Sequence, residues 1–155
     1  MDRRDHNKPD PDPPDPVAAS SAYLETRLGR AGGMIARSYD RYFSSGLYSS
    51  RYPHPNMRTL RLIQQHLPQG GRLLDFGAGE GRYSLALVRS RKAQVVAVDI
   101  SDVARAELAR QARAANLDAQ MKICGPDDAL YQQEVASKGG FDVVLFAFGV
   151  LGHIA

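Results

Sequence analysis

Hydrophobic positions in the second half of the chain fall into short apolar runs, separated by longer stretches with helical spacing. The runs predict strands and the longer stretches predict helices, because the two structures bury residues with different periods. The predicted strands are residues 72–76, 94–100, 119–124 and 141–150, and the predicted helices are residues 80–91, 102–116 and 127–138. This alternation predicts βαβ units and an α/β fold, with a doubly wound parallel sheet in three layers.

Two of the predicted strands are almost continuously apolar. They read QVVAVDI at 94–100 and FDVVLFAFGV at 141–150. Such runs are typical of strands in a parallel sheet that helices cover on both faces. The pattern therefore favours a sheet with helices on both sides.

The N-terminal part of the chain divides into a polar tail and a helical segment. Residues 1–18 contain five of the nine prolines and little apolar surface, so we expect a disordered tail. Residues 19–69 are predicted to form an N-terminal helical segment that precedes the core, residues 70–155. Its last helix begins after Asn56, a favourable N-cap residue. The apolar face of that helix comprises Met57, Leu60, Ile63 and Leu67.

Composition limits the class of protein and the compartment. The 155 residues are 43% hydrophobic and 24% charged, as in an ordinary soluble domain. No apolar run approaches the roughly 20 residues of a membrane span, and the N-terminus lacks the apolar core of a signal peptide. The single cysteine, Cys124, excludes an internal disulfide, so we expect a cytoplasmic protein without a membrane partner. The net charge is +3, and the arginines are scattered along the chain. We therefore do not expect a nucleic-acid partner.

The stretch DFGAGEG, residues 75–81, lies between the first predicted strand and the next helix. Ligands of open parallel sheets bind beyond the carboxyl ends of the strands, where this bend lies. Gly77, Gly79 and Gly81 stand at alternate positions, whereas a dinucleotide-binding loop needs G-x-G-x-x-G. That alignment would put Arg82 at the third glycine and spoil the helix–strand packing. A phosphate-binding P-loop is excluded too, because no Gly-Lys-Ser/Thr follows.

Two acids stand at the ends of the first two predicted strands. The carboxylate of Asp75, just before the first glycine, would repel a pyrophosphate and attract a ligand that carries an ammonium group. The alternative is that Asp75 caps the turn or the helix. Asp99, at the end of the second strand, can accept hydrogen bonds from both hydroxyls of a ribose. It could equally cap the next helix.

Together, Asp75, the three alternate glycines and Asp99 resemble the first motif and the following acid of the class I S-adenosylmethionine-dependent methyltransferases. The similarity covers residues 72–153. It implies a Rossmann-like fold, S-adenosyl-L-methionine as the cofactor and transfer of its methyl group to an acceptor. We expect the acceptor to be a small molecule.

The resemblance implies a role for each residue of the bend. Asp75 would lie near the methionine end of the cofactor. Backbone at Gly77 and Gly79 would let the cofactor pass close to the chain, because neither residue has a Cβ. Gly81 would allow tight packing of a helix.

Further positions are implied for the adenosine end of the cofactor. Asp99 would bind the ribose hydroxyls and Ile100 would pack on the adenine. Asp127 or Asp128 would accept a hydrogen bond from the adenine amino group. For these two aspartates, a role as helix N-cap is an equal alternative.

Acceptor chemistry and shielding of the cofactor involve three more candidates. A sulfonium already activates the methyl carbon, so a general base is needed only for a protonated acceptor. His153, just after the fourth strand, is the candidate base, with a structural role as the alternative. Tyr39 and Tyr42 are expected to contact the methionine carboxylate or to shield the sulfonium. Aromatic packing against the sheet is the alternative for both tyrosines.

The sequence departs from the family after its fourth predicted strand. A complete family domain has seven strands, so the resemblance implies a C-terminally truncated or split domain. Its fourth strand would then form a sheet edge and favour homo- or hetero-association. Three functions stay open: a methyltransferase, a non-catalytic cofactor-binding fragment or part of a split enzyme, and a nicotinamide-dependent oxidoreductase. Arg82 and Asp75 disfavour the last of these.

Overall fold

The computed structural model describes residues 32–137 and 139–147, and the chain divides into two compact units, Met1–Ile35 and Ala36–Ala155. Only residues 32–35 of the first unit are described, and they are helical. The predicted N-terminal tail lies outside the described residues. The sheet and the candidate site belong to the second unit.

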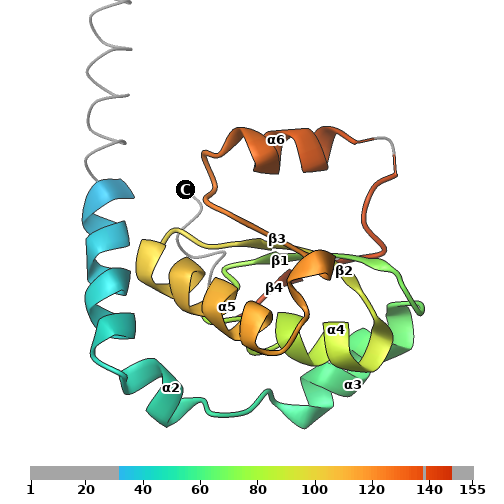
Figure 1. Cartoon of the computed structure of the whole chain (residues 1–155), viewed down its shortest axis with the longest axis horizontal. Helices are drawn as coiled ribbons and strands as arrows, with labels where there is room; N and C mark the ends of the chain where they lie inside the picture. The colour runs from blue at the N-terminus through green and yellow to red at the C-terminus, as the bar shows by residue number, and fades with distance from the viewer. Residues whose placement is uncertain (1–31, 138, 148–155) are drawn as a thin grey trace, which may run out of the picture. The chain divides into compact units, whose positions relative to one another are not determined.

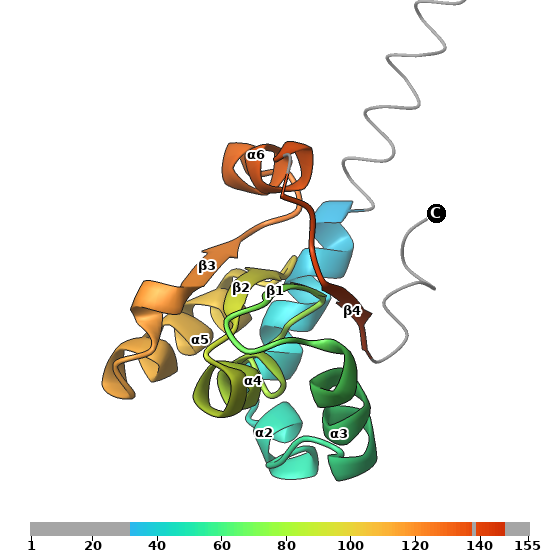
Figure 2. The same cartoon turned by 90° about the vertical axis from the view of Figure 1, so that its right-hand side faces the viewer.

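Four parallel strands form a single sheet. They are β1 (Arg72–Phe76), β2 (Gln94–Val98), β3 (Met121–Cys124) and β4 (Val143–Phe146), in the spatial order β3-β2-β1-β4. Figures 1 and 2 show how the strands lie beside one another. Because all strands run the same way, the segments that follow β1 and β2 emerge at the same edge of the sheet. This edge is where an open α/β sheet binds ligands.

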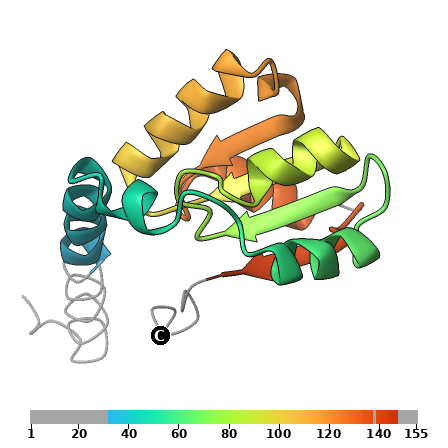
Figure 3. The same cartoon turned by 90° about the horizontal axis from the view of Figure 1, so that it is seen from below.

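Helices cover both faces of the sheet, as Figure 1 shows. One face carries α3 (Met57–His66), α4 (Ser84–Arg91) and α5 (Asp102–Ala114), and α6 (Ala129–Ala136) lies over the other. Figure 3 shows α4 and α5 side by side across the first face. The arrangement confirms the predicted three-layer, doubly wound α/β fold, with four strands described.

The core is divided by the sheet, because successive strand residues point to opposite faces. The larger cluster lies on the side of α3, α4 and α5 and includes Leu67, Leu73, Leu87, Val95 and Leu108. The smaller cluster lies on the side of α6 and comprises Leu74, Val96, Val98 and Cys124. Burying a side chain such as Leu73 stabilises the fold by about 2 kcal/mol.

Helix α3 begins where the sequence predicted. The Asn56 side chain accepts hydrogen bonds from the backbone N–H groups of Arg58 and Thr59, which confirms the N-cap. The predicted apolar face is buried at Leu60, Ile63 and Leu67. The prediction was wrong for Met57, which lies in the first turn and is 55% exposed.

Several predicted elements are shorter in the structure. The helix predicted at 80–91 begins at Ser84, because Gly81 has φ +80°, which is incompatible with a helix. The strand predicted at 94–100 ends at Val98, and a 3₁₀-helix (Asp118–Gln120) occupies the start of the strand predicted at 119–124. The predicted helices 102–116 and 127–138 end at Ala114 and Ala136.

Strand β4 differs from the strand predicted at 141–150. It begins at Val143, and the predicted end lies outside the described residues. Just before it, Asp142 donates its backbone N–H to the carbonyl of Arg72 and accepts the backbone N–H of Arg72 with its carboxylate. Among described strands β4 pairs with β1 alone and therefore forms an edge. Val144 and Phe146 are 49% and 41% exposed, so helices cover this apolar run less than predicted.

The described helices include none that is both long and apolar enough to cross a lipid bilayer.

Candidate functional site: a glycine bend between two buried carboxylates

The glycine bend, residues 77–81, connects β1 to α4 at the ligand-binding edge of the sheet. Gly77, Gly79 and Gly81 all have left-handed backbone, with φ of +81°, +56° and +80°. Residues with a Cβ rarely adopt this conformation, which explains glycine at each alternate position. The carbonyl of Val98, the last residue of β2, accepts hydrogen bonds from the N–H groups of Gly77 and Ala78. The bend is therefore tied to the end of the neighbouring strand.

Two of the glycines lie where a side chain would meet neighbouring atoms. A Cβ on Gly81 would come within 2.1 Å of Leu108 Cδ1 in α5, so this glycine permits close packing of that helix. A Cβ on Gly79 would lie 3.3 Å from the ring of Phe43 and 3.3 Å from the hydroxyl of Tyr48. The two aromatic side chains therefore lie directly against the middle of the bend.

Asp75, the carboxylate at the end of β1, is only 1% exposed. Its Oδ2 accepts a hydrogen bond of 2.6 Å from the hydroxyl of Ser84, the first residue of α4. Burial raises the pKa of Asp75 from 3.8 to about 6, and the hydrogen bond from Ser84 opposes the rise. Buried acids with a raised pKa are frequent at functional sites of proteins, which makes Asp75 a candidate.

Asp99, the first residue after β2, is 8% exposed and uses both carboxylate oxygens. Oδ2 accepts the backbone N–H of Gly79 at 2.7 Å, and Oδ1 accepts that of Ser101 at 2.8 Å. Burial raises the pKa of Asp99, and the two backbone hydrogen bonds lower it. The carboxylate thus links the middle of the glycine bend to the start of α5, and each oxygen keeps a second lone pair for a ligand.

An aromatic segment, residues 39–55, lies against the bend. It contains part of a helix that ends at residue 44 and α2 (Leu47–Arg51). Phe43 is buried, and its ring centroid lies 4.8 Å from that of Tyr48. The rings of Tyr39 and Tyr42 pack on Phe43 at 6.4 and 5.8 Å.

The sequence analysis selected Tyr39 and Tyr42, but Phe43 and Tyr48 are the side chains that lie against the Cβ position of Gly79. Burial also raises the pKa of Tyr48 to about 12. The density of aromatic residues indicated the segment whose side chains lie against the bend. Spacing alone could not identify which rings face the bend, because Gly46 breaks the helix between them with φ +72°.

Three side-chain contacts hold the aromatic segment in place. The guanidinium of Arg82 lies 4.9 Å from the ring centroid of Tyr52 and 5.2 Å from that of Tyr83. The hydroxyl of Ser49 donates to Glu80 Oε2 at 2.6 Å. Asp40 accepts hydrogen bonds from the start of α5. In the sequence, Arg82 stands where a dinucleotide-binding loop would need its third glycine. In the structure, its side chain contacts the aromatic segment.

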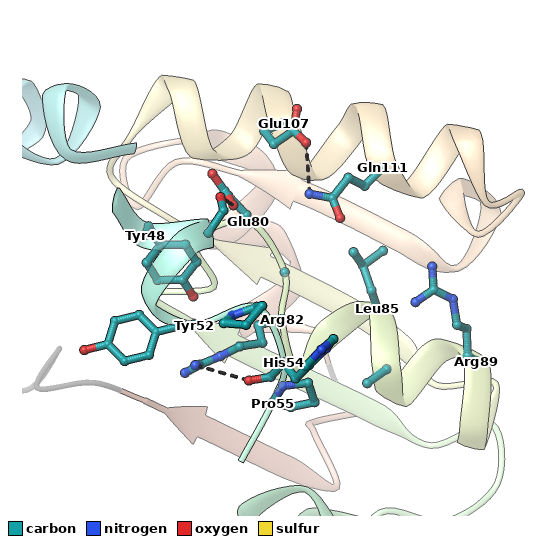
Figure 4. A pocket seen from close by; sticks show the side chains of 14 residues that line it. Tyr48, Tyr52, His54, Pro55, Glu80, Arg82, Leu85, Arg89, Glu107 and Gln111 are labelled. Carbon is teal, nitrogen blue, oxygen red and sulfur yellow. Dashed lines mark hydrogen bonds between the residues drawn. The ribbon is translucent and has the colours of Figure 1, made fainter. Parts of the chain in front are cut away.

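A cavity of about 350 Å³ opens beside the bend and is shown in Figure 4. Tyr48, Tyr52 and His54 line it from the aromatic segment, and Leu85 and Gln111 line it from α4 and α5. Four charged side chains complete its wall: Glu80, Arg82, Arg89 and Glu107. The lining includes neither Asp75 nor Asp99, so this cavity is separate from the two buried carboxylates.

The other predicted site residues are those for the adenine and the candidate base. Ile100 is half-buried after β2, and Asp127 is exposed before α6. Asp128 precedes α6 directly and accepts the backbone N–H of Gly125 at 2.5 Å. His153 lies outside the described residues. Within the described residues, no group of three histidine, cysteine or acidic side chains could hold a metal ion.

Comparison with known proteins identifies the family. Residues 73–155, more than half of the chain, match the family described as a methyltransferase domain. No curated protein matches the sequence.

Similar solved structures include an S-adenosylmethionine-dependent methyltransferase from Thiobacillus denitrificans in complex with S-adenosyl-L-homocysteine. It is 24% identical over 64% of this chain and 40% of its own, with a TM-score of 0.48. A methyltransferase from Geobacter sulfurreducens, also in complex with S-adenosyl-L-homocysteine, is 19% identical over 53% of this chain and 35% of its own, with a TM-score of 0.43. The [4+2]-cyclase SpnF is 29% identical over 45% of this chain and 26% of its own, with a TM-score of 0.42.

The chain thus spans less than half the length of each of these structures. The family match extends from β1 to the last residue and includes the glycine bend and both buried carboxylates. The chain therefore belongs to the class I S-adenosylmethionine-dependent methyltransferase family.

Proposed function

We propose that the glycine bend binds S-adenosyl-L-methionine and that the protein transfers its methyl group to a small-molecule acceptor. One observation carries the proposal. Three left-handed glycines connect two buried carboxylates at the carboxyl ends of neighbouring parallel strands, in a chain of the methyltransferase family. The positions of Gly77 and Gly79 leave backbone accessible to a ligand at close range, since neither residue carries a Cβ.

The residues near Asp99 fit the adenosine part of this cofactor. The Asp99 carboxylate is fixed by two backbone N–H groups and keeps lone pairs that could accept the ribose hydroxyls. Ile100 is half-buried and would pack on the adenine. Asp127 is the better candidate for the adenine amino group, because Asp128 already accepts a hydrogen bond from Gly125.

The residues on the other side of the bend fit the methionine part. Asp75 would supply negative charge for the ammonium group, and ionisation of its buried carboxyl would be favoured by that cation. The rings of Phe43 and Tyr48 would shield the sulfonium through cation–π contacts. In this proposal Tyr39 and Tyr42 support those rings from behind.

The bound cofactor supplies a methyl group already activated by its sulfonium, so the chain mainly has to align the acceptor and exclude water. Phe43, which is buried, and Tyr48 would exclude water from the middle of the bend. His153 is proposed as the base for an acceptor that must lose a proton.

We also propose that the protein associates through the edge of β4. Among the described strands, β4 pairs on one side only, and Val144 and Phe146 leave apolar surface exposed beside that edge. Unpaired strand edges of this kind readily accept another strand. Light scattering should therefore detect a dimer or higher species, and a strictly monomeric protein would contradict this association.

Calorimetric titration of the full chain with S-adenosyl-L-methionine tests the cofactor, and NADH serves as the control ligand. We expect saturable binding of S-adenosyl-L-methionine and none of NADH. Asp99→Asn should weaken binding by about 10- to 100-fold, because a neutral amide replaces the charged carboxylate that is proposed to accept the two ribose hydroxyls. The matched control is Asp118→Asn, which neutralises an exposed carboxylate far from the bend in sequence and should leave binding unchanged.

Two results would contradict the proposal. One is a folded wild-type protein, verified by circular dichroism, that does not bind S-adenosyl-L-methionine. The other is equal affinity in Asp99→Asn and Asp118→Asn. Transfer of a labelled methyl group to a panel of small molecules then tests catalysis, and binding without transfer to any acceptor would indicate a non-catalytic chain.

A further inference from the structure

A chain of hydrogen bonds connects the helix that ends at residue 44 to the glycine bend. Asp40 Oδ1 accepts the hydroxyl hydrogen of Ser101 at 2.6 Å, and it also accepts the backbone N–H of Val103 at 3.3 Å. The backbone N–H of Ser101 in turn donates to Asp99 Oδ1, and Asp99 Oδ2 accepts the N–H of Gly79. Ser101 and Asp99 therefore connect Asp40 to Gly79 of the bend by hydrogen bonds. Asp40 and Ser101 are 61 positions apart in the sequence.

Capping of α5 does not by itself explain Asp40. Ser101 is the N-cap residue, and its Oγ already accepts the backbone N–H of Ala104 at 3.1 Å. The Asp40 carboxylate satisfies one more free N–H of the first turn and is stabilised by the helix dipole. Asp40 also connects the start of α5 to the helix that ends at residue 44, which is distant in the sequence.

The same helix contacts the bend at a second place. Asp40 and Phe43 are three positions apart and therefore lie on neighbouring parts of one helical face. The ring of Phe43 lies against Gly79, while Asp40 bonds to the residue that fixes Asp99. This one helix thus contacts Gly79 and Ser101, the two residues whose backbone N–H groups donate to the Asp99 carboxylate.

We propose that Asp40 is a positioning residue for the adenosine end of the site. Through Ser101 it orients the Asp99 carboxylate, and it couples the position of the helix that carries Phe43 to binding of the ribose at Asp99. This inference rests on the proposed function, because it assigns Asp99 to the ribose hydroxyls. Ser101 is fully buried, so its hydroxyl has a fixed position from which to relay the contact.

The test compares two ligands that differ by one ribose hydroxyl, 5′-methylthioadenosine and its 2′-deoxy analogue. Wild-type protein should prefer the first by roughly tenfold or more, as expected for a hydrogen bond to a carboxylate. Asp40→Asn should reduce this preference at least about threefold, because Asp99 is then oriented less well. Asp118→Asn is the control with the same change of charge and should keep the wild-type preference.

A second variant verifies the route through Ser101. Ser101→Ala removes the hydroxyl that donates to Asp40 but retains the backbone N–H that donates to Asp99. Combined with Asp40→Asn, it should lower the ligand preference no further than Ser101→Ala does alone, since Asp40→Asn only weakens, by removing the charge of the acceptor, the connection that Ser101→Ala removes. Additive losses of preference would show that the two residues act separately and would overturn the route.

The outcomes separate this inference from the proposed function. Wild-type protein that binds neither adenosine ligand nor S-adenosyl-L-methionine contradicts the proposed function, and the coupling is overturned with it. Binding by wild type, with both ligands weakened equally in Asp40→Asn, leaves the proposed function intact and overturns the coupling. In that case Asp40 only anchors the helix. If Asp40→Asn lowers the preference for 5′-methylthioadenosine over its 2′-deoxy analogue, the result supports the coupling.

Discussion

The glycine bend and the aromatic segment form two parts of one candidate site, but they are held in place by different contacts. The bend is fixed by backbone N–H groups that donate to the Val98 carbonyl and to the buried carboxylate of Asp99. The aromatic segment is held by side-chain contacts, which include the exposed Ser49–Glu80 hydrogen bond and the partly buried Asp40–Ser101 hydrogen bond. Segments with few buried contacts open at low free-energy cost. The comparison indicates a preformed bend and a cover that can leave it.

Gly81→Ala is the change that should damage the bend most. A Cβ there meets Leu108 Cδ1 at 2.1 Å in a packed core, and the left-handed backbone adds strain. We expect a loss of about 2–4 kcal/mol in the free energy of unfolding, measured by urea denaturation.

Gly70→Ala is the matched control, because Gly70 has φ +71° but no atom within 4 Å of the Cβ position. It should show the backbone strain alone, about 1–2 kcal/mol. An equal loss in both variants would mean that the bend is not closely packed against α5.

Asp75→Asn should stabilise the protein, because it removes a buried charge from the bend. At pH 7 the carboxyl is ionised in the folded and unfolded states, and its pKa is raised from 3.8 to about 6 in the fold. The cost of that ionisation is about 3 kcal/mol, so the gain in the free energy of unfolding should approach this value.

The gain from Asp75→Asn should depend on pH in a defined direction. As the pH falls from about 6 to 3.8, the folded wild type takes up a proton before the unfolded chain does, so its own stability rises. The difference between variant and wild type should therefore shrink and vanish near pH 4. Urea denaturation at several pH values measures it, and a difference that is independent of pH would contradict the raised pKa.

Arg82→Lys should loosen the aromatic segment and spare the bend. Lysine retains the charge but loses the planar group that lies near the rings of Tyr52 and Tyr83. We expect a loss of about 1 kcal/mol and faster amide hydrogen exchange at residues 48–54, with unchanged exchange at Gly79. Arg89→Lys, at an exposed arginine on α4, is the control. Faster exchange at Gly79 would show that the two parts are one rigid unit.

Ser49→Ala should have the smallest effect. It removes one exposed hydrogen bond to Glu80, so stability should change by less than about 0.5 kcal/mol. Hydrogen exchange at the backbone N–H of Tyr52, which donates to the Tyr48 carbonyl, should still be faster in Ser49→Ala than in the control Ser50→Ala. A loss above about 2 kcal/mol would place Ser49 in a more tightly packed region than its exposure indicates.

Much of the framework could be predicted from the sequence. The bounds of β1 were predicted correctly, because a short apolar run ends there at the glycines. The N-cap at Asn56 follows from local rules on caps, and the packing role of Gly81 was implied by the resemblance to the family. Local preference also explains the main error at α4, since three left-handed glycines delay the helix to Ser84.

The contacts of the aromatic segment could not be predicted, because they join residues far apart in the sequence. Asp40 meets Ser101, and Phe43 and Tyr48 meet Gly79, but no spacing rule connects such positions. The edge position of β4 is different, because the resemblance to the family implied that the fourth strand forms a sheet edge. Among the described strands β4 does pair on one side only, and this leaves Val144 and Phe146 exposed.

An NMR titration of the isotope-labelled full chain with S-adenosyl-L-homocysteine tests the central claim most directly. The account predicts saturable shifts at the amides of Gly77, Gly79, Asp99 and Ser101, with smaller shifts along the aromatic segment. Saturable shifts confined to the amides of Leu85, Arg89 and Gln111 would place the ligand in the neighbouring cavity and contradict the account. The absence of shifts in a folded protein would contradict it as well.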